Sequence, residues 1–332
     1  MRVRFVAVVG ALFCIFALPS TSVPAPGATV DLGHLRPERC NAEHRYRIVG
    51  KVRLLLAWAS ADDVGGARIT WRAGEQNQSV ALLIGSEPRR APRGVNEWGY
   101  IREDVSADAT NVFGIRTVTG GDSPEDAEAR RRARARVVEL GVLCAKVSRD
   151  DAASRTATVH VPSDASYRDL DRVIDLIERH AVWNGRRTPR PANVAPGFLT
   201  AMDLMMRISV RQSGDTAACP RLSFVYKDAV YDLIPRRVER VAALRTASGA
   251  YENLLRTDVA VKNRATGAIT GFSITYGTEG ALAGVPVTAK YQPNWWFKVE
   301  LELDEGQDVP PDPAADVSIN ERIAQLCLRN AE

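Results

Sequence analysis

The sequence predicts an α+β fold: a strongly bent antiparallel sheet, or half-barrel, with about three helices that cover or fill it. Two blocks of alternating apolar and polar residues, at 44–119 and 220–304, indicate the strands. Between them, at 123–140, 165–181 and 198–212, apolar residues recur at helical spacing. Because the strands gather in two blocks instead of alternating with helices, an antiparallel sheet is favoured over βαβ units.

The first strand block begins near Tyr46. Tyr46, Ile48, Val52, Leu54, Leu56 and Trp58 share one face of an extended chain, and Arg47, Lys51 and Arg53 share the other. Four further extended segments follow, at 67–71, 79–84, 95–105 and 111–118.

The middle of the chain contains the helix signals. Ser123, Pro124 and the acids after them form a helix start, and Gly141 ends that segment. Strands are expected at 142–147 and 155–161. The Pro/Gly/Arg-rich stretch 184–196 is expected to be a loop. The helix at 198–212 is apolar around much of its girth, so we expect it to be enclosed.

The second strand block consists of hairpins. A tight turn at Lys227-Asp228 joins the first pair of strands, and Gly267 lies in the turn of the next. In the last strand, Trp295, Phe297, Val299, Leu301 and Leu303 share one face, and Trp296, Lys298, Glu300, Glu302 and Asp304 share the other.

The N-terminus has the layout of a secretory signal peptide. Arg2 and Arg4 flank the start of an apolar run that ends near Leu18, and small residues follow up to Ala28. The domains are therefore expected to be a signal peptide and cleavage zone (1–28), an irregular tether (29–43), a single α+β domain (44–304) and an acidic, Pro-rich tail with a short closing helix (305–332). Two domains split near residue 190 are the alternative. We expect a secreted or periplasmic protein with no integral membrane span after cleavage.

Cleavage would remove Cys14 and leave four cysteines. In an exported chain, four cysteines indicate two disulfides, with three possible connectivities. Cys144–Cys219 with Cys40–Cys327 is favoured slightly, since the second bond would tie together both ends of the mature chain.

Charge and motifs exclude several function classes. The chain has 44 Lys and Arg against 40 Asp and Glu, which gives no global electrostatic case for a nucleic-acid partner. Five arginines lie within residues 130–136, but nearby acidic residues partly neutralise their charge. No aromatic residue lies among them for base stacking. No metal-ligand spacing, phosphate loop or nucleophile motif occurs, so neither a metal nor a cofactor is expected.

Two hairpins carry a resemblance. The stretch Gly284–Val287 followed by Tyr291–Leu301, which reads YQPNWWFKVEL, resembles the closing hairpin of uncharacterised exported bacterial proteins, and the hairpin at 222–233 is similar to theirs. That family is associated with a curved antiparallel sheet like that of periplasmic lipoprotein carriers. The resemblance implies a sheet that wraps helices and can enclose an apolar ligand, and it implies no catalytic residue.

Two functions follow as hypotheses. The first is a non-enzymatic binding protein for an apolar small molecule or lipid, with a pocket between the bent sheet and the Met-rich helix. Its expected lining is Trp98, Met202, Met205, Met206 and Trp295. The alternative is a hydrolase-like envelope enzyme whose site is assembled from distant residues such as Glu97, Glu103 and His160.

Overall fold

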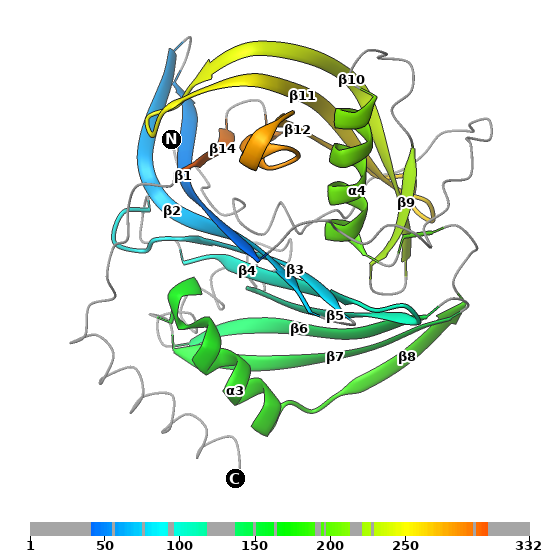
Figure 1. The fold of residues 1–332 in the computed structure, drawn as a ribbon. Coiled ribbons are helices and arrows are strands. Elements are labelled where there is room, and N and C mark those ends of the chain that lie inside the picture. The colour runs from blue at the N-terminus through cyan, green and yellow to red at the C-terminus, as the bar shows by residue number, and fades with distance from the viewer. Residues whose placement is uncertain are drawn as a thin grey trace.

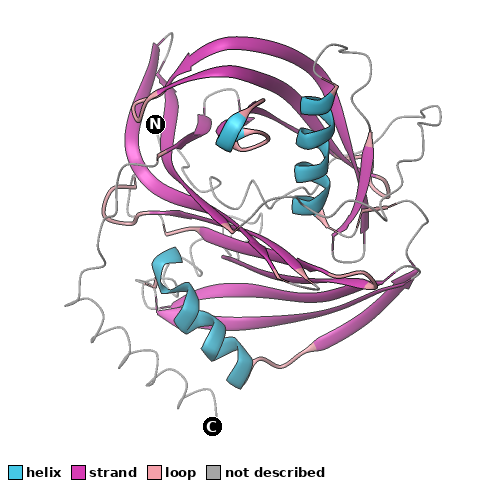
Figure 2. Cartoon of the chain, in the orientation of Figure 1, coloured by secondary structure: helices cyan, strands magenta, loops and turns pink. Residues whose placement is uncertain are grey.

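The computed structural model describes residues 41–54, 57–74, 77–91, 96–117, 137–148, 151–162, 165–189, 194–195, 197–212, 221–226, 229–294 and 297–304. These residues form one 14-stranded sheet with the strand order β8-β7-β6-β5-β4-β3-β2-β1-β14-β13-β12-β11-β10-β9. Every pair of neighbouring strands in it is antiparallel (Figures 1 and 2).

The strands of the first half are β1 (Ala42–Leu54), β2 (Ala57–Ala73), β3 (Gln78–Ser86), β4 (Trp98–Val105), β5 (Ala109–Thr117), β6 (Val137–Ser148), β7 (Asp151–Pro162) and β8 (Asn184–Pro189). Those of the second half are β9 (Leu222–Tyr226), β10 (Ala229–Arg245), β11 (Ala250–Asn263), β12 (Ile269–Gly277), β13 (Pro286–Asn294) and β14 (Phe297–Leu303). The described helices are α3 (Leu170–His180), which follows the 3-10 turn η3 (Tyr167–Asp169), α4 (Phe198–Arg211) and the short η5 (Gly280–Leu282).

The pairing of β1 with β14 joins the first and last described strands of the chain in the middle of the sheet. Tyr46 lies opposite Leu303 and Ile48 opposite Leu301 on the apolar face, while Arg47 lies opposite Glu302 on the polar face. This register keeps the apolar residues of both strands on one face and the charged residues on the other. A slip of one residue would move the charges to the apolar face. All other neighbouring strands in the sheet are consecutive in sequence.

The sheet curls over on itself, and α4 lies inside the curl (Figure 1). Met205 and Leu204 of α4 share a core with strands β9 to β12, and Leu199 shares another core with β2 to β6. Helix α3 instead covers the opposite face of β3 to β7, where Val173 and Ile177 pack on Trp98 and Leu140. The strands β3 to β6 are therefore covered on both faces.

The turn η3 docks on glycines of β2 and β3. A Cβ atom on Gly85 would come within 2.3 Å of the Tyr167 ring, and one on Gly66 would come within 2.9 Å of its hydroxyl. The side chain of Tyr167 thus occupies space that only glycine leaves open at these two positions.

The predicted half-barrel filled by about three helices is wrong. The molecule is mainly one continuous sheet of 14 strands, and of the two α-helices that the structure describes α4 lies in its concave space and α3 on the opposite face. The expected helices at 165–181 and 198–212 are present as η3 with α3 and as α4. The expected helix at 123–140 lies mostly outside the described residues, and its end, from Val137, is part of strand β6.

The prediction of a loop at 184–196 is also wrong for its first six residues. Residues 184–189 form β8, an edge strand whose backbone pairs with β7, so its Pro/Gly/Arg-rich composition misled the prediction. An edge strand tolerates proline and charged residues because only one side of its backbone is paired.

The expected disulfide between Cys144 and Cys219 is not present, because Cys144 on β6 is a free thiol. Burial raises the pKa of this thiol, and the nearby Arg155 and Arg102 lower it less. Cys40, Cys219 and Cys327 lie outside the described residues, as do the expected signal peptide, most of the tether and the C-terminal tail. Among the described helices, neither length nor apolarity suffices to cross a membrane.

Candidate apolar ligand site

A cavity of about 110 Å³ lies between α4 and the concave face of the sheet. Its wall comes from both halves of the chain, since β1 to β3 form one side and β11 to β14 the other. The side chains that line it are almost all apolar; they include Ile69, Trp71, Leu82, Phe198, Leu199, Met202, Met206, Phe272, Ile274, Ala289, Tyr291 and Leu301.

Two charged residues also border the cavity, Asp203 and Lys290. The Asp203 carboxylate forms a 2.7 Å ion pair with Arg207 one turn later on α4, and both side chains are largely buried. Lys290 alternates with the cavity residues Ala289 and Tyr291, so its side chain lies on the other face of β13, where it pairs with Glu300. Since each charge is paired, the cavity itself offers an apolar surface with few polar groups, which is typical of small-molecule sites.

Glu103 on β4 positions the first turn of α4. Its carboxylate accepts hydrogen bonds of 2.8 Å from the backbone N–H groups of Leu199 and Thr200, and of 2.6 Å from the Thr200 hydroxyl. The N-cap residue of α4 is Gly197, which has no side chain for this purpose, so a strand residue supplies the acceptors.

Glu103 is fully buried, and this burial determines its electrostatics. Burial raises the pKa of Glu103, while the hydrogen bonds from Thr200, Leu199 and Phe198 lower it less. The same carboxylate holds the end of α4 that carries the cavity residues Phe198 and Leu199.

The structure brings only part of the predicted lining together. Met202 and Met206 line the cavity. Met205 is fully buried, but it packs into the core with β9 to β12 and does not line the cavity. Trp98 lies on the opposite face of the sheet, in the core beneath α3. Trp295 lies outside the described residues.

Most residues of the cavity wall were not predicted from the sequence. Ala289, Tyr291, Val299 and Leu301 alternate along β13 and β14, and that alternation was visible in the sequence. It did not indicate that this face meets α4. Phe198 and Leu199 lie on the same helix as the predicted methionines, but helical spacing does not distinguish them as cavity residues.

The residues considered for catalysis do not form a site. Glu97 and Glu103 belong to the β4 region, and His160 lies on β7, so strands β5 and β6 separate them. The Glu103 carboxylate is hydrogen-bonded to the first turn of α4, and His160 is exposed opposite Glu139. The described part of the chain contains no group of three or more His, Cys, Asp and Glu side chains that could hold a metal ion.

Comparison with known proteins provides no further constraint on the site. No protein-family model, no curated protein and no solved structure matches this chain.

Proposed function

We propose that this protein is exported and binds an apolar or lipid-like ligand in the cavity beside α4, without catalysis. The single observation that carries the proposal is the wall of that cavity, which one helix and two groups of strands, distant in sequence but adjacent in the sheet, line almost entirely with apolar side chains. When a ligand removes apolar surface of this kind from water, the free energy of binding becomes more favourable by about 25 cal/mol per Å².

The size of the cavity limits the ligand. An engineered apolar cavity of about 150 Å³ stays dry and takes up benzene. At about 110 Å³, the present cavity fits a small ring or a short piece of an acyl chain. Met202 and Met206 are unbranched and adapt to irregular shapes, so rotation of their side chains would admit a longer chain.

A cavity-filling variant tests the proposal. Titration with the apolar dye N-phenyl-1-naphthylamine should give a saturable rise in fluorescence for the wild-type protein. Ala289→Leu adds bulk to the cavity wall on β13 and should weaken dye binding about tenfold or more, because the ligand and the new side chain compete for the same space.

Met205→Leu is the matched control. Met205 is buried on the same helix but does not line the cavity, so this variant should bind the dye like the wild type. If the wild type binds no dye, or if both variants weaken binding equally, the cavity is ordinary core and the proposal fails. Native mass spectrometry of protein purified from its own host, after lipid extraction of a parallel sample, would identify the natural ligand.

The proposed export rests on the charged, apolar and small-residue order of residues 1–28. The intact mass of the protein from the periplasm or medium should correspond to a chain that begins between residues 22 and 29. Recovery of the full chain only from the cytoplasm would contradict export without affecting ligand binding.

A further inference from the structure

The outer face of strands β10 to β14 has a groove of about 490 Å³. Its floor consists of small residues, Ala260, Gly271 and Ser273, which lie on neighbouring strands. Ala260 alternates with Val259 and Val261, which belong to the core around α4, so the groove lies on the face turned away from the apolar cavity.

Cations surround this floor. Arg236, Arg256, Lys290 and Lys298 line the groove, and Asp258 is the single acid among the lining residues. Lys51 on β1 lies directly opposite Lys298 on β14. The groove therefore has an excess of positive charge, although Arg256 pairs with Glu239 at 3.5 Å and with Asp258 at 3.9 Å.

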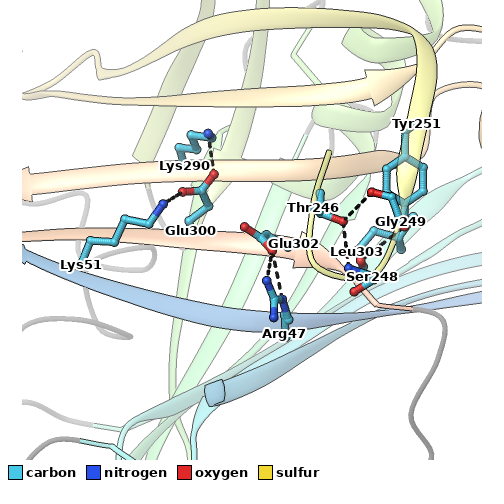
Figure 3. A network of polar contacts seen from close by, with 10 residues as sticks. All are labelled: Arg47, Lys51, Thr246, Ser248, Gly249, Tyr251, Lys290, Glu300, Glu302 and Leu303. Atoms are coloured by element: carbon cyan, nitrogen blue, oxygen red, sulfur yellow. Dashed lines mark hydrogen bonds and ion pairs between the residues drawn. The ribbon is translucent and has the colours of Figure 1, made fainter. Parts of the chain in front are cut away.

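One buried carboxylate neutralises part of this charge. Glu300 is 3% exposed and accepts hydrogen bonds from Lys51 at 2.6 Å and Lys290 at 2.5 Å (Figure 3). Both lysines reach it from the strands on either side of β14. Burial alone would raise the pKa of Glu300, but these hydrogen bonds and charges hold it below its usual range.

Lys298 has no such partner. Within the described part of the chain, no hydrogen bond or ion pair reaches its ammonium group, although the side chain is half-buried. Its pKa is lowered by burial and by the charges of Lys290, Lys51 and Arg256, which outweigh the opposing effect of Glu300. Like charges directly opposite each other on adjacent strands destabilise a sheet, so this arrangement costs free energy when the groove is empty.

Backbone irregularities aim two further side chains at the groove. Arg236 is the extra residue of a bulge in β10, where the register with β11 shifts between Pro235 and Arg237. Gln292 lies at a second shift, between β13 and β14. Bulges redirect side chains and occur often beside functional sites. Arg236 is exposed, and within the described residues it forms no hydrogen bond or ion pair.

We propose that this groove is a binding site for an oxyanion of the phosphate class. Lys298 would donate to it directly, Lys290 and Arg256 would add charge beside it, and the floor of small residues leaves room for an anion to approach the sheet. Arg236 lies on β10, four strands away from Lys298 on β14, and would add charge at the other end of the groove. Several cations along one groove favour a multiply charged anion over a single carboxylate. The phosphate could be a free ion or the headgroup of an anionic lipid, and the experiment below separates these sources.

Two probes and three variants test the site. Binding of inorganic phosphate is measured by calorimetry at low ionic strength. Binding to vesicles is measured by co-sedimentation, comparing phosphatidylcholine vesicles with and without phosphatidylglycerol. Lys298→Gln should weaken binding about tenfold, since it removes a charge-assisted hydrogen bond. Arg236→Gln should weaken binding less, since it removes only a charge at the other end of the groove. Lys146→Gln, which removes an exposed charge on β6 in the other half of the sheet, should change nothing.

The outcomes are distinct. Phosphate binding identifies a free ion as the ligand, and vesicle binding without phosphate binding identifies a headgroup. Both results support the site if Lys298→Gln weakens binding more than Arg236→Gln does. If neither probe binds, or if Lys146→Gln weakens binding as much, the proposal is overturned.

Stability provides a second readout. Lys298→Gln should raise the Tm of the unliganded protein, because it relieves the repulsion by Lys51 and Lys290, and phosphate should no longer raise the Tm of this variant. A variant that is less stable than the wild type would contradict the assignment of Lys298 as an unsatisfied cation. Binding of the apolar dye should be unchanged, so failure of this site and failure of the apolar cavity are separable.

Discussion

At the residue scale, Glu103 connects the sheet to α4. It is the acceptor for three donors of the first helical turn, two backbone N–H groups and one hydroxyl, in a place that water does not reach. Buried donors that lose their acceptor cost about 1–3 kcal/mol each. Glu103 is therefore expected to contribute strongly to the free energy of unfolding.

Glu103→Ala should lower the free energy of unfolding by about 3 kcal/mol or more, because it leaves these donors unsatisfied and opens a void. Chemical denaturation followed by circular dichroism measures this change. Thr200→Val is the graded control: it removes only the hydroxyl bond and should cost about 1 kcal/mol. A Glu103→Ala protein as stable as the wild type would show that the carboxylate does not hold the helix.

The raised pKa of Glu103 predicts a pH dependence with a definite sign. In the unfolded chain a glutamate ionises near pH 4.3. As the pH rises from there to the folded-state pKa, the unfolded chain has released its proton while the folded protein retains it, so stability falls. The stability advantage of the wild type over Glu103→Ala should therefore shrink as the pH rises through this window and then level off. An advantage that grows with pH would show that the pKa of Glu103 is lowered.

At the element scale, the start of α4 depends on close approach to β4. A Cβ atom on Gly197 would lie 2.2 Å from the Cδ atom of Glu103, so no side chain fits while the carboxylate stays in place. The Gly197 backbone is extended, with φ −162°, so this constraint comes from the contact and not from backbone strain.

Gly197→Ala should destabilise the fold by about 1–3 kcal/mol and also weaken apolar-dye binding, because it displaces the turn that carries Phe198 and Leu199. Gly114→Ala on β5 is the matched control, since its added methyl group meets nothing closer than 3.7 Å. Thermal unfolding and the dye titration read out the two effects. Equal behaviour of the two variants would refute the close contact.

At the scale of the whole molecule, the halves before and after residue 190 share one sheet. β1 pairs with β2 on one side and with β14 on the other, and α4 packs on strands of both halves. At the far end of the sheet, Ala195 adds a bridge to β9: its N–H donates to Ser223 O at 2.6 Å, and its carbonyl accepts from Val225 N at 3.2 Å.

The protein should therefore unfold in one cooperative transition, with coincident curves from circular dichroism and tryptophan fluorescence. Ala195→Pro removes the donor to Ser223 and should lower the Tm without splitting the transition. Two separate transitions in the wild type would show that the halves are independent domains.

The limits of sequence reasoning are visible in single residues. Strand alternation places Trp98 and Tyr100 on one face of β4, but both faces of β4 are covered, one by α3 and the other by α4. Alternation cannot tell which covered face meets a cavity. Met202, Met205 and Met206 are close neighbours on α4, and helical spacing does not reveal that Met205 faces β9 to β12 instead of the cavity.

The sequence alone determined the antiparallel character of the strands and the positions of α3 and α4, because hydrophobic period and turn residues act over short stretches of chain. Only the tertiary structure decided that β1 lies beside β14, and this pairing places Lys51 opposite Lys298 and brings β1 to β3 to the same cavity as β11 to β14. Both candidate sites arise from contacts between residues far apart in the chain. Local periodicity carries no information about such contacts, since the same alternating strand can pair with any partner of matching pattern.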